Sequence, residues 1–243
     1  MVFDSYSFAD IDNPALQKYK MFIFPQLFYM TPEKQAKLST LKKSGKTLVF
    51  LNAAGWITPD GTSQDSVIET TGINVKVLDN ASSLRTTITQ GANRGKTMEN
   101  SGKFYPVLQI NDAQASVRGT VVLQGSGKTV NSYAVKKNVN DEGWNSCVCS
   151  SPFITSNELR EILVKDAGVG VHSYCNSDTG VVYANNSMIA FHTATAGTYT
   201  LMAKEPVKWK MVNPTMEDSF SKSEQSHAFT ALRADTYIFV IEP

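Results

Sequence analysis

The chain has 243 residues, of which 42% are apolar and 19% charged, and its formal net charge at pH 7 is +1. This composition is that of a globular protein long enough for one large domain or two ordinary ones. The near-zero charge argues against nucleic acid or an anionic membrane as a partner, and no apolar run reaches the roughly 18 residues of a membrane span.

The amino terminus and the cysteines leave the compartment open. The first residues lack both a basic start and an apolar core, so no signal peptide is expected in this chain. Three cysteines are too few, and odd in number, for a disulfide framework. A mature or excised fragment would look the same, so the localisation is unknown.

The first predicted elements form a strand–helix–strand unit. Residues 21–24 and 47–51 are apolar runs typical of buried strands. Between them, a hydroxyl cap at Thr31, Pro32 and Glu33 predict a helix start, and Gly45 predicts its end. Such a unit is a right-handed parallel crossover. Because sites lie at the carboxyl ends of strands in open sheets of this kind, it points to the turn formed by Asn52, Ala53, Ala54, Gly55 and Trp56.

A short helix over residues 65–71, ended by Gly72, is expected next. Residues 75–145 then alternate between runs rich in valine, threonine and aromatics and clusters of turn formers, which predicts strands. A strand over 144–149 precedes the best-marked helix, 157–167, where Thr155 and Glu158 have the spacing of a capping box. The predicted strands of the middle part are 75–78, 84–89, 105–110, 116–123 and 132–139.

The last part of the chain shows no helix from residue 171 onward. We place the boundary near Tyr174, so the expected organisation is an α/β domain over residues 1–173 and a β-domain over 174–243. The short strands predict a small antiparallel β-sandwich for this second domain. They are predicted at residues 180–184, 187–192, 199–203, 207–212 and 237–241.

Several motifs in the sequence have simple structural interpretations. Gly-Lys-Thr occurs three times, but each copy lacks the glycine five residues earlier that a phosphate loop needs. Cys147 and Cys149 point to one face of a predicted strand, and we interpret them as buried thiols, because zinc needs four ligands. His192 is interpreted as a hydrogen-bonded sheet residue. No cofactor or metal is therefore expected.

Two kinds of residue, paired carboxylates and exposed aromatics, would indicate a role in carbohydrate chemistry. Glycoside hydrolysis needs two carboxylates facing each other across a sugar, and the sequence nominates no such pair. Trp209 and Tyr199 are candidates for stacking on a sugar ring, and the alternative for each is core or interface filling.

The order of the motifs carries a resemblance. Residues 19–24, the Thr-Pro-Glu helix start and residues 45–55 (Gly-Lys-Thr-Leu-Val-Phe-Leu-Asn-Ala-Ala-Gly) resemble the glutamine-amidotransferase-like domain of β-galactosidase-like glycoside hydrolases. Residues 143–146, the Ser-Pro at 151–152, the helix after it and residues 167–169 do so too. Residues 172–201 are similar to the segment that leads into that family's closing β-domain. The resemblance covers essentially the whole chain.

The resemblance implies a flavodoxin-like, mostly parallel sheet with flanking helices and a class I amidotransferase ancestry, followed by the antiparallel β-sandwich. In active amidotransferases the strand ends in Gly-x-Cys-x-Gly, and the nucleophile position falls here on Ala53. Because a methyl group cannot attack a carbonyl, that chemistry is not available at this turn.

The resemblance also implies missing parts. The family domain begins with one more strand and helix, preceded by a TIM-barrel catalytic domain that holds the paired carboxylates, and neither matches this sequence. An absent first strand would leave one sheet edge open, and pairing with a second chain would cover it. In related β-galactosidases this domain mediates trimer contacts.

The leading hypothesis is a non-catalytic accessory or oligomerisation module, a pseudoenzyme, whose partner is a second copy or a glycoside hydrolase catalytic domain. One alternative is a hydrolase that acts on carbohydrate through an unrecognised pocket. Another is a carbohydrate-binding module that uses Trp209 or Tyr199. The candidate pocket consists of Asn52, Ala54, Gly55, Trp56 and His172.

Overall fold

The computed structural model describes residues 4–79, 81–98, 102–168, 173–175, 180–184, 187–212 and 220–242, with the backbone alone at 173–175 and 204. The chain divides into two compact units. One comprises Tyr6–Gly168, and the other comprises Val169–Pro243 together with Met1–Ser5. No helix within the described ranges has the length and apolar character needed to cross a bilayer.

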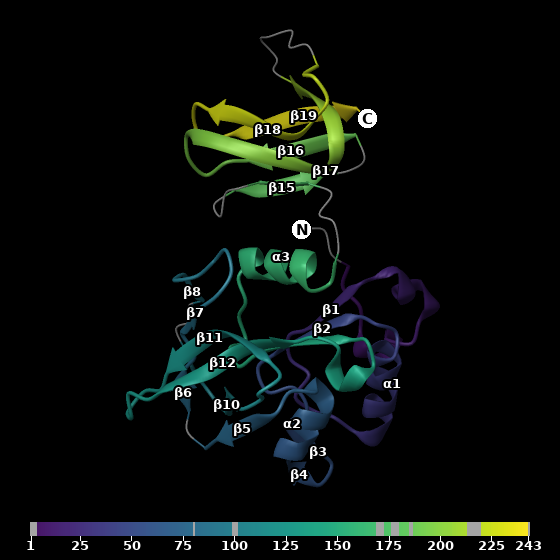
Figure 1. The fold of residues 1–243 in the computed structure, drawn as a ribbon, viewed down its shortest axis with the longest axis vertical. Helices are drawn as coiled ribbons and strands as arrows, with labels where there is room; N and C mark the ends of the chain where they lie inside the picture. The colour runs from purple at the N-terminus through teal and green to yellow at the C-terminus, as the bar shows by residue number, and fades with distance from the viewer. Residues whose placement is uncertain are drawn as a thin grey trace. The chain divides into compact units, whose positions relative to one another are not determined.

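The N-terminal unit is built on a seven-stranded sheet (Figure 1). Strands β1, β2 and β13 are parallel, and all other pairs in the sheet are antiparallel. β1 forms one edge. The strands in spatial order are β1 (Met21–Phe24), β2 (Thr47–Leu51), β13 (Asn145–Cys149), β12 (Thr129–Lys136), β11 (Ser116–Val122), β7 (Thr86–Ile88) and β8 (Thr97–Met98).

Three two-stranded ladders complete the strands of this unit. They are β5 (Val75–Leu78) with β10 (Val107–Ile110), β3 (Ile57–Thr58) with β4 (Gly61–Thr62), and β6 (Ser82–Ser83) with β9 (Lys103–Phe104). Short 3-10 turns lie at η1 (Phe8–Asp10), η2 (Pro14–Lys18) and η3 (Val139–Asp141).

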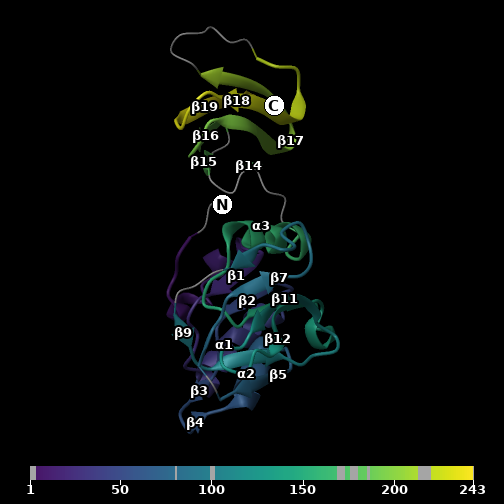
Figure 2. The ribbon, with the colours of Figure 1, turned by 90° about the vertical axis from the view of Figure 1, so that its left-hand side faces the viewer.

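Three helices cover the sheet. α1 (Pro32–Lys42) and α2 (Gln64–Thr71) lie on one face and α3 (Ser156–Lys165) on the other (Figures 1 and 2). Alternate residues of a strand point to opposite faces, so Phe50 packs in the core cluster with α1 and α2, whereas Val49 packs with α3. The predicted start of α1 is confirmed, because the Thr31 hydroxyl accepts a hydrogen bond from the backbone N–H of Lys34 at 3.3 Å.

The predicted fold class is wrong. Strands make up 42% of the structure and helices only 19%, and the sheets curl into half-barrels rather than forming a flavodoxin-like parallel sheet. The strand–helix–strand crossover of β1, α1 and β2 is present, but the parallel pairing extends no further than β13. After α2, strand β5 pairs with β10 instead of joining the main sheet, and β11 and β12 return antiparallel.

The C-terminal unit is all antiparallel. Its strands are β14 (Ser173–Cys175), β15 (Val181–Ala184), β16 (Met188–His192), β17 (Gly197–Val212), β18 (Glu224–Ala231) and β19 (Thr236–Glu242). The order is β14-β17-β19-β16-β15, and β18 also pairs with β17. The long β17 pairs with β18 mainly through its first half and with β19 through its second half. One strand shared between two ladders gives a curled sheet around an aromatic core, not the predicted sandwich.

Candidate functional site

The candidate pocket predicted from the sequence is the turn that follows β2. Asn52 is 5% exposed and has a left-handed backbone with φ of 61°. Its backbone N–H lies 2.8 Å from the carbonyl oxygen of Cys149 and 3.3 Å from that of Ser151. These contacts hold the turn against the end of the neighbouring parallel strand β13.

The rest of this turn is filled rather than hollow. Ala53 and Ala54 are fully buried in the core. The N–H of Gly55 donates to the carbonyl of Leu27 at 2.7 Å, and a side chain at Gly55 would collide with Thr70. Trp56 is half-buried against the same core. Asn52, Ala54, Gly55 and Trp56 are thus neighbours in one packed turn, whereas His172 lies outside the described residues.

One feature of the turn was not visible in the sequence. The Oδ1 atom of Asn52 is buried and has no hydrogen-bond partner, the one such side-chain atom within the described part of the chain. An unsatisfied buried oxygen costs about 1–3 kcal/mol, and a left-handed non-glycine residue adds strain. An uncharged amide is neither a nucleophile nor a general base, so this strained residue supplies no catalytic group.

A buried polar network lies between the sheet and α3. The Tyr133 hydroxyl donates to Oε1 of the fully buried Glu158 at 2.8 Å, and Nδ2 of Asn93 donates to its Oε2 at 3.0 Å. Arg118 binds Asp166 through two bonds of 2.7 and 2.8 Å. Burial raises the pKa of Tyr133. These groups satisfy one another, which is the requirement for a polar cluster that stabilises a core.

The two cysteines of β13 are buried on one face, beside this network. Burial raises the pKa of Cys149 to about 12 and that of Cys147 as well. Both are therefore neutral thiols near pH 7, and a neutral thiol is a poor nucleophile and metal ligand. Within the described ranges, no three His, Cys, Asp or Glu side chains are grouped so that they could hold a metal ion.

The two candidates for sugar stacking lie in the core of the C-terminal unit. Trp209 is 1% exposed, stacks on His227 with ring centroids 5.6 Å apart, and donates from Nε1 to the carbonyl of Glu224. Tyr199 is 6% exposed, and its hydroxyl donates to the carbonyl of Thr195. Rings buried in this way cannot stack on a sugar.

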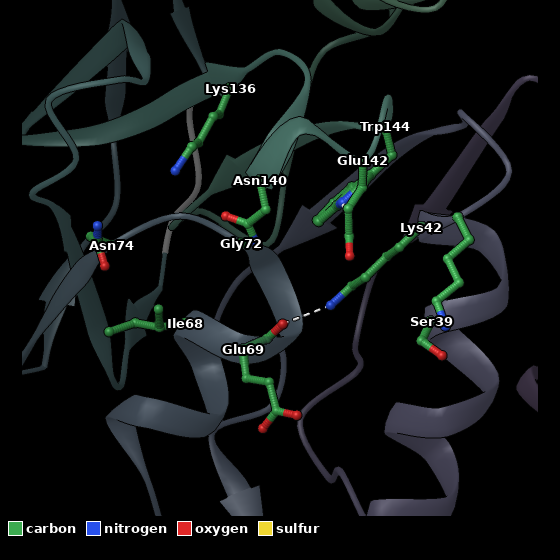
Figure 3. Close-up of a pocket in the computed structure, with 11 residues that line it drawn as sticks. Ser39, Lys42, Ile68, Glu69, Gly72, Asn74, Lys136, Asn140, Glu142 and Trp144 are labelled. Atoms are coloured by element: carbon green, nitrogen blue, oxygen red, sulfur yellow. Dashed lines mark hydrogen bonds between the residues drawn. The ribbon is translucent and has the colours of Figure 1, made fainter.

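The structure instead has a pocket that sequence reasoning missed, drawn in Figure 3. It has a volume of about 360 Å³ and lies where the carboxyl ends of α1 and α2 meet the connection between β12 and β13. Its lining residues are Ser39, Lys42, Lys43, Ile68, Glu69, Gly72, Asn74, Lys136, Asn140, Glu142 and Trp144.

Lys42 crosses one side of this pocket. Its ammonium donates to the backbone carbonyl of Glu69 at 2.6 Å, drawn dashed in Figure 3, and lies 5.1 Å from the centroid of the Trp144 ring. Burial lowers the pKa of Lys42, against the opposing effect of the carboxylates of Glu69 and Glu142. The Trp144 ring is 1% exposed, and its Nε1 donates to Glu142 at 3.3 Å.

The connection between β12 and β13 is strained. Asn138, Asn140 and Asp141 have φ values of 48°, 52° and 59°. The Asn138 side chain donates to Asp141 and accepts from the N–H of Gly143, which locks the loop. Left-handed non-glycine residues are costly and gather at functional sites. The asparagines of this loop were the available sequence signal, but their proximity to α1 and α2 depends on tertiary packing.

Comparisons with known proteins give the fold a context. No protein-family model matches the chain, and no curated protein matches it in sequence. A β-galactosidase from Bacillus circulans sp. alkalophilus is similar in structure, with a TM-score of 0.57 and 15% identity over 95% of this chain and 34% of that one. Gan42B, a GH42 β-galactosidase from G. stearothermophilus, has a TM-score of 0.52 and 15% identity over 93% and 32%.

A β-galactosidase from the Antarctic haloarchaeon Halorubrum lacusprofundi is also similar, with a TM-score of 0.52 and 11% identity over 90% of this chain and 32% of that one. The chain spans about a third of the length of these proteins. The similarities do not show a glutamine-amidotransferase-like domain. At these identities the likeness concerns the fold alone. The chain therefore has a β-galactosidase-like fold, similar to that of about a third of these proteins.

Proposed function

We propose that this chain is a non-catalytic accessory module of a β-galactosidase-like glycoside hydrolase and that it contributes a contact between subunits. The observation that carries the proposal is the fold likeness, which extends over 90–95% of this chain but only about a third of each β-galactosidase. A likeness of this extent is expected when a chain corresponds to one part of a larger enzyme.

The absence of chemistry at the strand end supports the non-catalytic half. Ala53 occupies the position where the resemblance would place a nucleophile, and it is fully buried. Neither Cys147 nor Cys149 can replace it, because both are buried as neutral thiols.

An apolar row on the outer face of the C-terminal sheet supports the contact half. Tyr183, Ala190, Ile238 and Val212 are paired in register across β15, β16, β19 and β17. Their sequence neighbours point into the core, so this row points outward. Tyr183 is 68% and Val212 47% exposed. Ala190 and Ile238 lie between them and are partly exposed, and contiguous apolar surface marks protein contacts more often than isolated residues do. We propose a second copy of this chain as the partner.

Solution mass tests the contact. Light scattering of the purified chain over a dilution series should show a dimer or trimer that dissociates on dilution. Tyr183→Arg should raise the dissociation constant about tenfold or more, because it places a charge in the contact. Leu232→Arg is the matched control, since Leu232 is 85% exposed at the end of β18, outside the row. A wild-type monomer at every concentration would overturn the contact role.

An enzyme assay tests the proposal that the chain is non-catalytic. The purified chain should not hydrolyse aryl galactosides above the rate of a buffer blank. Hydrolysis that co-purifies with the chain and is lost when the chain is unfolded in urea would overturn the non-catalytic assignment.

A further inference from the structure

We propose that the pocket between α1, α2 and the β12–β13 connection binds a neutral polyhydroxylated ligand, a single sugar unit. The choice of sugars as the polyol class rests on the proposed function, whereas the neutral, hydroxyl-rich character follows from the pocket itself. The groups assigned to binding are the side chains of Asn74, Asn140, Glu69 and Lys43.

Two of the three lysines of the pocket are already engaged. The Lys42 ammonium is held by the Glu69 carbonyl and the Trp144 ring. Lys136 forms an ion pair of 3.0 Å with Asp112, whose side chain is 2% exposed. The ammonium groups of these two side chains are therefore already engaged before any ligand arrives.

The remaining polar side chains have free hydrogen-bonding capacity. Within the described part of the chain, the side chains of Asn74, Asn140, Glu69 and Lys43 form no hydrogen bond or ion pair. They offer two amides, one carboxylate and one ammonium, a set that is balanced in charge and both donates and accepts. A hydroxyl group also donates and accepts, so a ligand with several hydroxyls satisfies such a set.

An anion fits this pocket less well. The carboxyl ends of α1 and α2 meet here, and the carbonyl end of a helix dipole repels negative charge. The carboxylates of Glu69 and Glu142 act in the same direction. A small cation is disfavoured too, because the positive charge of the Lys42 ammonium lies close enough to interact with both carboxylates.

Size and rigidity are consistent with one sugar ring. A volume of about 360 Å³ is at the small end of ligand sites. Figure 3 shows Asn74, Lys136, Asn140 and Ile68 around one part of the pocket. The left-handed loop fixes Asn140 in advance, which reduces the entropy lost on binding.

An NMR titration of the full chain with galactose and with lactose tests the proposal. We expect saturable shifts of the side-chain amide signals of Asn74 and Asn140 and of the Trp144 indole N–H, with a dissociation constant on the order of millimolar. Phosphate and glycine, at matched ionic strength, are the anionic and zwitterionic probes. Saturation by either of these and not by the sugars would overturn the proposal, as would the absence of any saturable shift.

Variants locate the site. Asn140→Gly removes the amide while glycine accepts the φ of 52° without strain, and it should weaken sugar binding about 2- to 10-fold. Asn131→Ala is the matched control, because Asn131 is exposed on β12 and does not line the pocket. Equal affinities of the two variants would overturn the assignment. Self-association without sugar binding would refute this site alone, and sugar binding by a strict monomer would refute only the subunit contact.

Discussion

Gly72 lines the pocket, and its replacement by alanine tests whether the connection between β12 and β13 packs against the end of α2. Gly72 ends α2 with φ of 70° and ψ of 9°, and its N–H donates to the carbonyl of Ile68 at 2.7 Å. A Cβ added there would lie 2.6 Å from Cγ1 of Val139 and 2.9 Å from the Trp144 ring. Both neighbours belong to the connection between β12 and β13.

The expected loss of stability has two parts. Left-handed backbone costs alanine roughly 1–2 kcal/mol relative to glycine, and overpacking adds roughly 1–3 kcal/mol. Gly72→Ala should therefore lower the free energy of unfolding by about 2–5 kcal/mol. Gly45→Ala is the matched control, because Gly45 follows α1 with φ of 69° and a Cβ there would meet only the Gly143 carbonyl, at 3.7 Å. It should cost only the conformational part.

Urea unfolding followed by circular dichroism gives both values, and the Trp144 indole N–H signal reports whether the loop has moved. The structure predicts that Gly72→Ala is less stable than Gly45→Ala by about 1–3 kcal/mol. Equal losses in the two variants would refute the reasoning, since they would mean that the loop does not pack on the end of α2.

Two further changes test the buried polar groups by urea unfolding. Burial opposes ionisation of Asp112, but the N–H of Asn74 and the ammonium of Lys136 outweigh it and lower its pKa below 3.8. The ionised Asp112 carboxylate therefore contributes its full stabilisation above pH 3.8 and loses it as the pH falls through the lowered pKa. Asp112→Asn should make the free energy of unfolding fall less steeply as the pH is lowered. An unchanged slope would contradict this prediction. Tyr133→Phe leaves the buried Glu158 with one donor fewer and should cost about 1–3 kcal/mol. A loss below about 0.5 kcal/mol would show that the bond stabilises nothing.

Much of the local structure was predictable because its signals are local. The cap at Thr31 and the proline after it start α1 as predicted, and Gly72 ends α2 as predicted. The strand predicted at residues 75–78 is β5. The predicted helix over 157–167 is α3, one residue earlier at its start and two shorter at its end. Caps, glycines and apolar runs act through neighbouring residues, so sequence alone is enough to recognise them.

Pairing between strands was not predictable in the same way. Runs 199–203 and 207–212 were predicted as two strands but form the single β17, and β18 was missed. An alternating apolar pattern indicates that a strand has one buried face. It does not indicate which strand pairs with it, or whether the pair is parallel or antiparallel. The resemblance supplied a parallel order for the sheet, and the antiparallel return of β11 and β12 overturned it.

The crossover unit, the start of α1, the end of α2 and the absence of a nucleophile at Ala53 can all be read from the sequence. Each depends on residue identity at one position or on near neighbours. Tertiary structure alone decided the burial of Trp209 and the position of the pocket. The pocket joins Lys42, Glu69 and Asn140, which are far apart in the chain and meet only through the packing of two helices against one loop. Such a meeting depends on every contact between them, and no short stretch of sequence carries that information.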